Sequence, residues 1–568
     1  MARVRSNQHV LHSVAKKFGA FDLQQQSGGF IGRVSDLREK STQVGTFAVV
    51  NLSNVMDRMA VWSSALPDIK VAYPVKVNYD PALLELIASA GGSFDVASAK
   101  EIDLAIQAGG DTERMIFSHT AKLASHMQKA AAAGVRLSII DSVDEMQKHA
   151  KHWPNAEILL RLTVARDDWH LGQKFGASLD EGPELFREAR ELGLTIRGVH
   201  FHVGSLASSA SPYLAALEDA RVAMDMGSTA GHDMAIVNMG GGFQYPSDSA
   251  SPLAKHDFLA AAAQIKGAMA KFGDHVEFMA EPGTFMAMAS TTIAVDVVSV
   301  RNNGAIWVHE STYGSLNALS WPGYKDIVGN SISVLPMGQS EKHYKPAAGS
   351  TPVNGITCDW ADVINLPVGL QASSLSASDI LLFENQGAYS LSCACDFNGY
   401  ELSSMPVNYI YDSSEMKDGF QVRYKIDAVP DKGWGIVLEQ EVKKGEPVWA
   451  FKGEGKTHAF HDEATVRAKL QVLAKNPRSH ESMRFFLNHI FGWDGRIIEL
   501  IGDCRFMNHS STPVIGTTDG ETWVALRDLS RGEEIVDNYE TYSNPDWYVD
   551  LCKEYDVEWA SRVAELYN

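Results

Sequence analysis

The feature that most constrains the fold is an alternation of short apolar runs and amphipathic stretches between about residues 70 and 285. The apolar runs have the length of buried strands, whereas the stretches between them have helical periodicity. In the first stretch, Asp80 can cap a helix, Pro81 suits its first turn and Gly91 can stop it. Eight such units predict a closed (β/α)8 barrel rather than an open sheet. The runs are VAYPV, SFDVA, MIFSH, RLSIID, EILLRLT, TIRGVHFHV, MAIVNMG and VEFMAE.

Polar residues and glycines stand where these expected strands end. Barrels of this kind hold their active sites at the C-terminal ends of the strands, so we expect these residues to share one rim. A single histidine or carboxylate at a strand end is usually structural, but a full set on one rim favours a functional site. The set comprises Lys76, Asp95, His119, Arg161, His202, Gly240, Gly241, Gly242 and Glu281.

Lys76 lies in the apolar segment VAYPVKVNYDP, where an ammonium group would be stripped of water. We therefore expect a lowered pKa and a nucleophilic amine. The three glycines at 240–242 let backbone N–H groups approach an anion, and barrels often bind phosphate after strands seven and eight. A lysine and a phosphate cradle on one barrel suggest pyridoxal phosphate, held as a Schiff base.

The composition sets the remaining limits. A chain of 568 residues is long for one hydrophobic core, so we expect two or three domains. The net charge of -20 argues against nucleic acid and anionic membranes as partners. The apolar runs fall well short of the roughly 18 residues of a membrane span. The 5 cysteines show no metal-binding spacing, so we expect no metal and a cytoplasmic location.

Several short motifs occur in a characteristic order between residues 20 and 412: PVKVN, FDVAS, HFHVGS, GGGF, AEPG, TCDWAD and ENQGAYS. This part of the chain resembles the eukaryotic-type ornithine decarboxylase family, whose pyridoxal phosphate enzymes have the alanine-racemase-like fold. The resemblance implies a β-rich domain built partly from the N-terminus, and a homodimer with shared active sites. We expect residues 1–45 to join the β-rich domain, 46–284 to form the barrel, 285–412 to complete the β-rich domain and 413–420 to be a linker.

The resemblance also implies roles around the cofactor. Lys76 is the Schiff-base lysine, and His202 stacks on the cofactor ring. Glu281 faces the pyridine nitrogen, whose pKa a nearby anion raises by about 1–3 units. A protonated ring is the better electron sink, which suits decarboxylation. The other residues implied to support the cofactor or to contact its phosphate are Asp95, Glu101, Arg161, Ser205, Gly240, Gly241, Gly242 and Tyr389.

Two residues of the TCDWAD motif complete the implied reaction, and two departures from the family pattern concern its ligands. Cys358 resembles the cysteine that returns a proton to Cα, and Asp359 the carboxylate that binds the distal amine across the dimer interface. Thr284 replaces an arginine on the phosphate, so we expect about tenfold weaker non-covalent cofactor binding. Trp321 stands where the family places the YDH segment and reshapes the substrate pocket. Ornithine, lysine, arginine, diaminobutyrate and a modified basic amino acid remain open as substrates.

The segment from residue 421 to 568 carries a second set of motifs: DKGWGIVLEQEVKKGEPV, DCRFMNHSS and RGEEIVDNYE. In this order they resemble a SET domain, the mostly-β fold of lysine methyltransferases that use S-adenosylmethionine. The resemblance implies that Trp434, Arg505, Asn508 and His509 contact the methyl donor. It also implies that Tyr539 is the catalytic tyrosine. A basic protein substrate would suit the acidic chain.

The leading hypothesis is a bifunctional chain, a decarboxylase of a basic amino acid that releases CO2 and a di- or polyamine, fused to a methyltransferase-like domain. A second hypothesis is an inactive decarboxylase-like dimer that binds a regulator. A third makes the barrel a scaffold for an active SET methyltransferase. Cofactor binding, CO2 release and methyl transfer separate the three.

Overall fold

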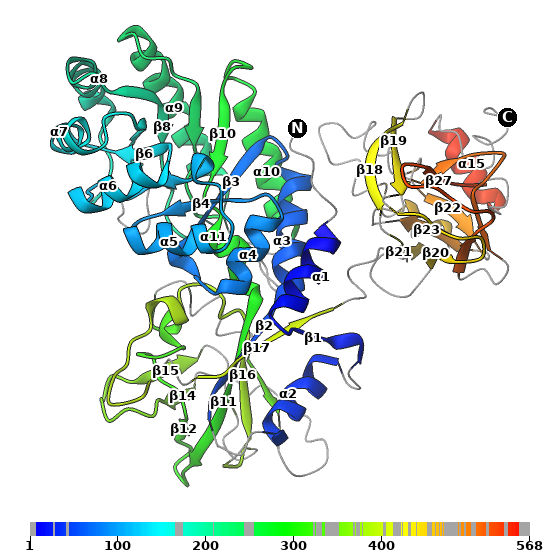
Figure 1. Cartoon of the computed structure of the whole chain (residues 1–568). Helices are drawn as coiled ribbons and strands as arrows, with labels where there is room; N and C mark the ends of the chain where they lie inside the picture. The colour runs from blue at the N-terminus through cyan, green and yellow to red at the C-terminus, as the bar shows by residue number, and fades with distance from the viewer. Residues whose placement is uncertain are drawn as a thin grey trace. The chain divides into compact units, whose positions relative to one another are not determined.

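The chain, seen here as a computed structural model, forms two compact units, Met1–Asp412 and Ser413–Asn568, which we describe separately (Figure 1). In the first unit the structure describes residues 7–25, 29–40, 45–164, 174–207, 209–243, 255–321, 324, 332–335, 351–366, 370, 375–377, 379–401 and 405–412. In the second unit it describes residues 422, 424–429, 433–438, 440–450, 457–460, 462–464, 466–467, 470, 487, 490–493, 496–500, 507–517, 522–538 and 544–555.

The first unit contains the predicted barrel. Eight parallel strands close in the order β10-β3-β4-β5-β6-β7-β8-β9, which confirms the eight apolar runs as its strands. A cluster of buried aliphatic side chains that includes Ile116, Leu159 and Met279 fills the barrel. The strands are β3 (Ile69–Pro74), β4 (Ser93–Val96), β5 (Ile116–Phe117), β6 (Leu137–Ile140), β7 (Glu157–Arg161), β8 (Thr195–His200), β9 (Ile236–Asn238) and β10 (Glu277–Ala280).

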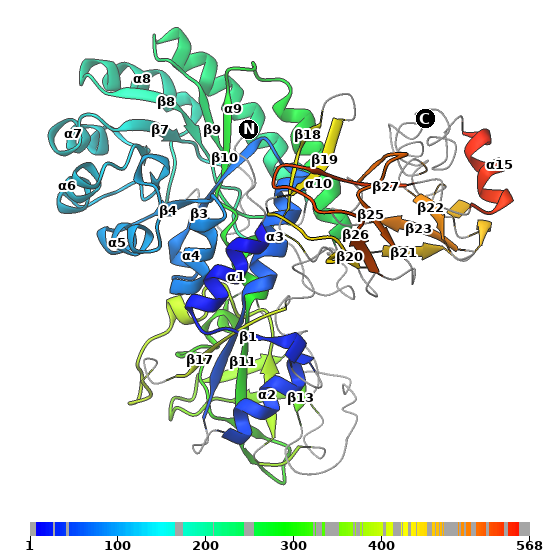
Figure 2. The same ribbon diagram turned by 45° about the vertical axis from the view of Figure 1, so that its right-hand side comes forward.

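Helices line the outside of the barrel, as Figure 2 shows for α5 to α8. Local signals set their ends: the Asp80 carboxylate caps α4 by accepting hydrogen bonds from the N–H groups of Ala82 and Leu83, as predicted. Among the described residues, no helix is long and apolar enough to cross a membrane. The helices are α3 (Leu52–Ala65), α4 (Pro81–Ser89), α5 (Ala99–Gln107), α6 (Ala124–Ala133), α7 (Val143–His152), α8 (Gly182–Glu191), α9 (Ser211–Thr229) and α10 (Lys255–Met269).

A nine-stranded sheet forms the β-rich domain of the first unit. Strand β2 precedes the barrel in the chain, yet it lies between β11 and β17, which follow the barrel. The N-terminal part of this domain therefore extends to Asn51. Helix α1 (Asn7–Lys17) packs against α3 and α4, and α2 is Gly29–Lys40. The strands are β1 (Phe21–Asp22), β2 (Phe47–Asn51), β11 (Thr291–Val300), β12 (Ile306–Val308), β13 (Ile332–Leu335), β14 (Thr351–Asn354), β15 (Val363–Leu366), β16 (Ile380–Phe383) and β17 (Val407–Tyr411).

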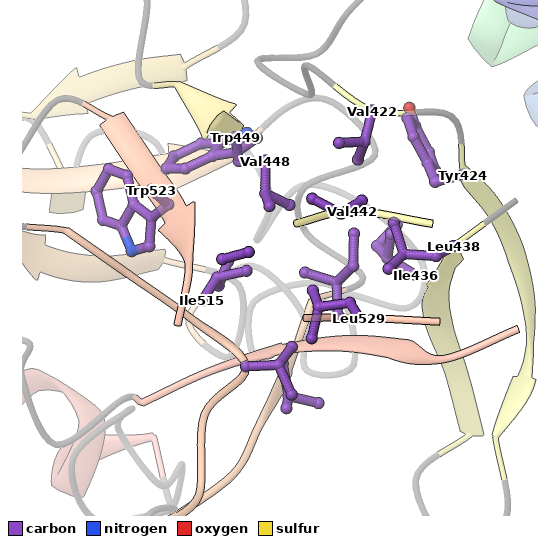
Figure 3. Packing of buried hydrophobic residues seen from close by; sticks show 14 of the residues in the cluster. Val422, Tyr424, Ile436, Leu438, Val442, Val448, Trp449, Ile515, Trp523 and Leu529 are labelled. Atoms are coloured by element: carbon purple, nitrogen blue, oxygen red, sulfur yellow. The ribbon is translucent and has the colours of Figure 1, made fainter. Parts of the chain in front are cut away.

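The second unit is mostly β-structure in three small sheets. Their strand orders are β18-β19-β27-β24, β20-β26-β25 and β21-β23-β22. A buried core joins side chains of the first two sheets, with Trp449 and Trp523 in edge-to-face contact at 4.6 Å between ring centroids (Figure 3). The elements are β18 (Tyr424–Val429), β19 (Gly433–Leu438), β20 (Pro447–Ala450), β21 (Thr457–Phe460), β22 (Ile490–Trp493), β23 (Arg496–Leu500), β24 (Asn508–His509), β25 (Ile515–Thr517), β26 (Thr522–Ala525), β27 (Glu534–Asp537) and α15 (Asp546–Glu554).

Candidate active site

Lys76 and Asp95 form the first pair of the site. Lys76 lies on the short 3-10 helix η2 (Val75–Val77), which follows β3 directly, and β4 brings Asp95 alongside the end of β3. The Lys76 amine donates a hydrogen bond to Asp95 Oδ2 at 2.7 Å. Asp95 is fully buried, whereas the Lys76 side chain is 42% exposed. The amine therefore lies at the open end of the barrel, with its counterion in the wall.

The expected lowering of the Lys76 pKa is wrong. Partial enclosure lowers the pKa of Lys76, but the negative charge of Asp95 and the nearby Tyr389 and Glu281 outweigh that effect, so its pKa is raised. Burial raises the pKa of Asp95 in turn, despite the opposing charge of Lys76. The amine of this state is an ammonium that must give up a proton before it can act as a nucleophile.

Glu281 follows β10 and lies at the same end of the barrel. Its N–H donates to the carbonyl of Gly240 at 2.7 Å. Asn238 Nδ2 donates to Glu281 Oε1 at 2.8 Å, and His200 Nε2 lies 3.3 Å from the same oxygen. Burial alone would raise the pKa of Glu281, but His200 and Lys76 lower it to about 2. Glu281 is therefore a buried anion at neutral pH.

His202 and the glycine triplet lie beside Glu281. His202 Nδ1 accepts a hydrogen bond from the N–H of Gly204 at 3.0 Å, and burial lowers its pKa to about 3. The ring is therefore neutral and can stack on a flat aromatic group. Gly240 and Gly242 have φ angles of 60° and 103°. A Cβ on Gly241 would stand 2.8 Å from His202 Nε2 and 2.9 Å from the carbonyl oxygen of Glu281.

Three aromatic side chains, those of Trp321, Tyr324 and Tyr389, form a cluster near the N-terminus of the short helix α11 (Gly283–Ala287). The hydroxyl groups of Thr284 and Tyr324 are 2.9 Å apart. The Tyr389 ring centroid lies 5.4 Å from that of Trp321 and 6.0 Å from that of Tyr324. The Tyr389 N–H donates to the carbonyl of Val77 at 2.9 Å, which ties this group to the 3-10 helix that carries Lys76.

These residues suit pyridoxal phosphate. The site offers an amine for an aldehyde, a neutral imidazole for a ring and a buried carboxylate for a pyridine nitrogen. The backbone at 240–242 is so closely packed that a side chain on Gly241 would displace His202. A lysine and an acid can act on one cofactor only if they lie at the same end of the barrel. Lys76 and Glu281 do so, because they follow β3 and β10, which are paired neighbours.

Comparison with known proteins agrees with this geometry. Residues 52–288 match the family model described as the pyridoxal binding domain of pyridoxal-dependent decarboxylases. A chloroplastic ornithine decarboxylase of Nicotiana glauca is 33% identical over 380 residues, which cover 64% of this chain and 84% of the relative. The chain belongs to the ornithine decarboxylase family. An ornithine decarboxylase of Mus pahari is 30% identical over 492 residues, covering 81% of this chain and 98% of the relative.

Solved structures in this family share the fold. The arginine decarboxylase of Paramecium bursaria Chlorella virus, bound to agmatine, superposes with a TM-score of 0.60 at 29% identity, covering 67% of this chain and 100% of that chain. The lysine decarboxylase of Selenomonas ruminantium gives a TM-score of 0.58 at 28% identity, covering 66% of this chain and 94% of that chain.

The remaining barrel residues of the expected site are Arg161, His119, Glu101 and Ser205. The Arg161 guanidinium lies 4.7 Å from the centroid of the Phe175 ring, and the His119 ring lies 6.2 Å from it. Glu101 accepts a hydrogen bond from the N–H of Ala97 at 2.6 Å, so its carboxylate helps to fix the start of α5. Ser205 follows Gly204 in the loop after β8.

The two TCDWAD residues lie in the β-rich domain, between β14 and β15. Cys358 is exposed, and its N–H donates to Asn398 Oδ1 at 3.0 Å. Asp359 accepts a hydrogen bond from the hydroxyl group of Tyr313, which lowers the pKa of Asp359. The neighbouring Trp360 is 90% exposed. One loop thus carries the exposed Cys358 thiol, the half-buried Asp359 carboxylate and the exposed Trp360 ring.

The second unit contains a SET domain, because the family model of that domain matches residues 433–540. Asn508 Nδ2 donates to Glu534 Oε1 at 2.7 Å, and a Cβ on Gly435 would stand 2.9 Å from that nitrogen. His509 is paired in register with Asp537 on β27. The structure thus brings Asn508 beside the strand that carries Trp434. The Trp434 side chain, Arg505 and Tyr539 lie outside the described residues.

Sequence reasoning missed three neighbours of the site: His200, Asn238 and Tyr324. The motif HFHVGS directs attention to His202, although residues two apart on a strand share a face, so His200 also points inward. Asn238 reads as an ordinary strand residue before the glycines. Tyr324 lies in a turn-rich stretch whose pattern gives no sign of its contact with Thr284.

Proposed function

We propose that the first unit decarboxylates a basic amino acid, using Lys76 to hold pyridoxal phosphate covalently. The observation that carries the proposal is the arrangement of the Lys76 amine, the neutral His202 ring and the ionised Glu281 at one barrel end. The relatives named above are ornithine, arginine and lysine decarboxylases, which supports a basic amino acid as the substrate.

Each side chain has its own role in the proposed reaction. Lys76 would have to lose a proton before it could attach the cofactor aldehyde, and Asp95, whose Oδ2 lies 2.7 Å away, stabilises the ammonium form until then. His202 would stack on the ring, and Glu281 would keep the ring nitrogen protonated. When bound, pyridoxal phosphate supplies the electron sink for the pair left on Cα as CO2 departs. Backbone N–H groups at 240–242 and the hydroxyl groups of Thr284 and Tyr389 would hold the phosphate.

We further propose that the active form is a homodimer in which each site uses Cys358 and Asp359 of the other chain. Cys358 would return a proton to Cα after CO2 leaves. Asp359, kept anionic by the hydroxyl group of Tyr313, would bind the distal cation of the substrate. The exposure of the loop that carries both residues supports this proposal.

Release of CO2 from a panel of basic amino acids tests the proposed function. The panel contains ornithine, lysine, arginine, diaminobutyrate and Nε-methylated lysine. We expect release from at least one member and none from Lys76→Ala, which also loses the visible absorbance of the bound cofactor. A colourless protein that is silent across the panel would instead support the regulator-binding hypothesis.

A second activity is favoured by the match of residues 433–540 to the SET domain. We propose that this domain binds S-adenosylmethionine beside Asn508 and His509, and that Tyr539 lies at the methyl-transfer site. Methyl transfer from labelled S-adenosylmethionine to a basic protein, lost in Tyr539→Phe, tests this activity. Methyl transfer without CO2 release would support the scaffold hypothesis. A cytoplasmic location stays a prediction.

A further inference from the structure

Three neighbouring strands end in one register row, and two residues of that row contact Glu281. Arg161 of β7 pairs with His200 of β8, and His200 pairs with Asn238 of β9. We propose that His200 and Asn238 are positioning residues that hold Glu281 Oε1, so that Oε2 faces the ring nitrogen of the cofactor. This inference rests on the proposed function of the first unit.

The contacts to Glu281 are selective for one oxygen. Asn238 Nδ2 lies 2.8 Å from Oε1, and His200 Nε2 lies 3.3 Å from the same atom. The side chains of His200 and Asn238 are fully buried, so water does not compete for their contacts with Glu281. A carboxylate held through one oxygen has its plane and its second oxygen fixed, as a hydrogen bond to a pyridinium N–H requires.

Asn238 connects the ring acid to the phosphate loop. Its Oδ1 accepts a hydrogen bond from the N–H of Gly240 at 2.9 Å, while its Nδ2 donates to Glu281. Glu281 in turn donates its own N–H to the carbonyl of Gly240. One side chain therefore sets the distance between the expected phosphate site and the expected site of the ring nitrogen.

His200 supplies the second contact to Glu281 Oε1. The titratable groups that face Glu281 from the packed elements are Lys76, Asp95, His200, His202 and Tyr389, and Arg161 faces His200. His200 Nε2 lies 3.3 Å from Oε1, and burial lowers the pKa of His200, so a neutral imidazole packs against the carboxylate.

The segment His200-Phe201-His202 therefore carries two histidines with different tasks. Both imidazoles lie close to Glu281. His202 lies farther along the chain, beyond the end of β8, where it can cover the ring. His200 is the last residue of β8, and it contacts Glu281, the acid expected to face the ring.

The protonation state of the cofactor nitrogen tests the proposal directly. The holoenzyme is reconstituted with pyridoxal phosphate labelled with 15N in the ring, and the 15N chemical shift is measured for wild type, H200F and H200Q. We expect a protonated nitrogen in wild type, a shift toward the unprotonated value in H200F and recovery in H200Q, whose amide places a polar N–H group beside Glu281. Turnover of H200F should fall about tenfold, since a polar contact that holds a buried charged group is lost.

A cofactor analogue with carbon in place of the ring nitrogen separates positioning from general damage. If His200 acts through the nitrogen, H200F and wild type should have the same low residual turnover with the analogue. A further loss of turnover in H200F with the analogue would overturn the proposal. N238A provides a second arm if H200F does not fold, and it should produce the same shift of the 15N signal.

His149 supplies a matched control, because it is also a fully buried barrel histidine, but it contacts the hydroxyl group of Ser138 at 2.8 Å. H149Q should leave the 15N signal unchanged. An unchanged signal in folded H200F overturns the positioning role, provided that E281Q moves the signal. If E281Q also leaves the signal unchanged, Glu281 does not face the nitrogen and the proposed function itself is wrong in that respect.

Discussion

Asp95 and Glu281 are buried carboxylates in one site, yet their pKa values move in opposite directions. Burial dominates at Asp95 and raises its pKa. At Glu281, His200 and Lys76 outweigh burial and lower the pKa to about 2. Asp95 therefore pairs with the Lys76 ammonium, whereas Glu281 is suited to remain an anion throughout the reaction.

This difference predicts the pH dependence of cofactor attachment. Because Asp95 raises the pKa of Lys76, Asp95→Asn should lower that pKa and enlarge the neutral fraction of the amine at neutral pH. The attachment rate, followed by the visible absorbance of the apoenzyme mixed with pyridoxal phosphate, rises with pH until the amine is neutral. Its midpoint should move to lower pH in Asp95→Asn. An identical midpoint in both proteins would show that Asp95 does not control the amine.

Thr284 gives a second prediction for a single residue. Thr284→Arg should tighten the binding of pyridoxal phosphate about tenfold, because a charge-assisted hydrogen bond replaces a neutral one. Lys76→Ala is used as the background, so that only non-covalent binding is measured by titration. Pyridoxal, which lacks the phosphate, is the control and should bind equally to both proteins. Equal tightening for pyridoxal would place Thr284 away from the phosphate.

At the scale of elements, the strands and the rim follow from sequence patterns. Buried parallel strands give short apolar runs, and active sites of such barrels lie where the strands end. The positions of Lys76 and Glu281 on the barrel rim could therefore be predicted from the sequence. The pKa of Lys76 could not, because it depends on Asp95 from another strand. Tyr324 and His200 were missed for the same reason, since their partners are distant in the chain.

The glycine loop at residues 240–242, after β9, gives a prediction at the scale of elements. Gly241→Ala should abolish tight cofactor binding, since the new Cβ would lie 2.8 Å from His202 Nε2 and displace the ring. We also expect a loss of about 1–3 kcal/mol in the free energy of unfolding. Gly267→Ala is the matched control, because a Cβ there meets nothing within 4 Å. Cofactor titration and thermal unfolding check both effects, and normal binding by Gly241→Ala would remove the glycines from the site.

At the scale of the whole molecule, the chain joins a pyridoxal-dependent decarboxylase to a SET domain. The N-terminal segment and the residues after the barrel build one sheet, in which β2 lies between β11 and β17. Residues 387–392 of the β-rich domain also contact the 3-10 helix that carries Lys76, through the Tyr389 N–H and the Ser392 hydroxyl group. The barrel and the β-rich domain therefore support one site, which a second chain would complete with Cys358 and Asp359.

Mixing two inactive variants tests whether the site is shared. Lys76→Ala removes the covalent anchor, and Cys358→Ala removes the proposed proton donor of the other chain. If subunits exchange randomly, half of the dimers are mixed and each mixed dimer has one intact site. The mixture should therefore recover about a quarter of the wild-type CO2 release, whereas each variant alone stays nearly inactive. Recovery should vanish when both substitutions are on the same chain and the partner is either single variant. A mixture as inactive as its components, despite subunit exchange shown by a tagged chain, would mean that Cys358 acts within its own chain.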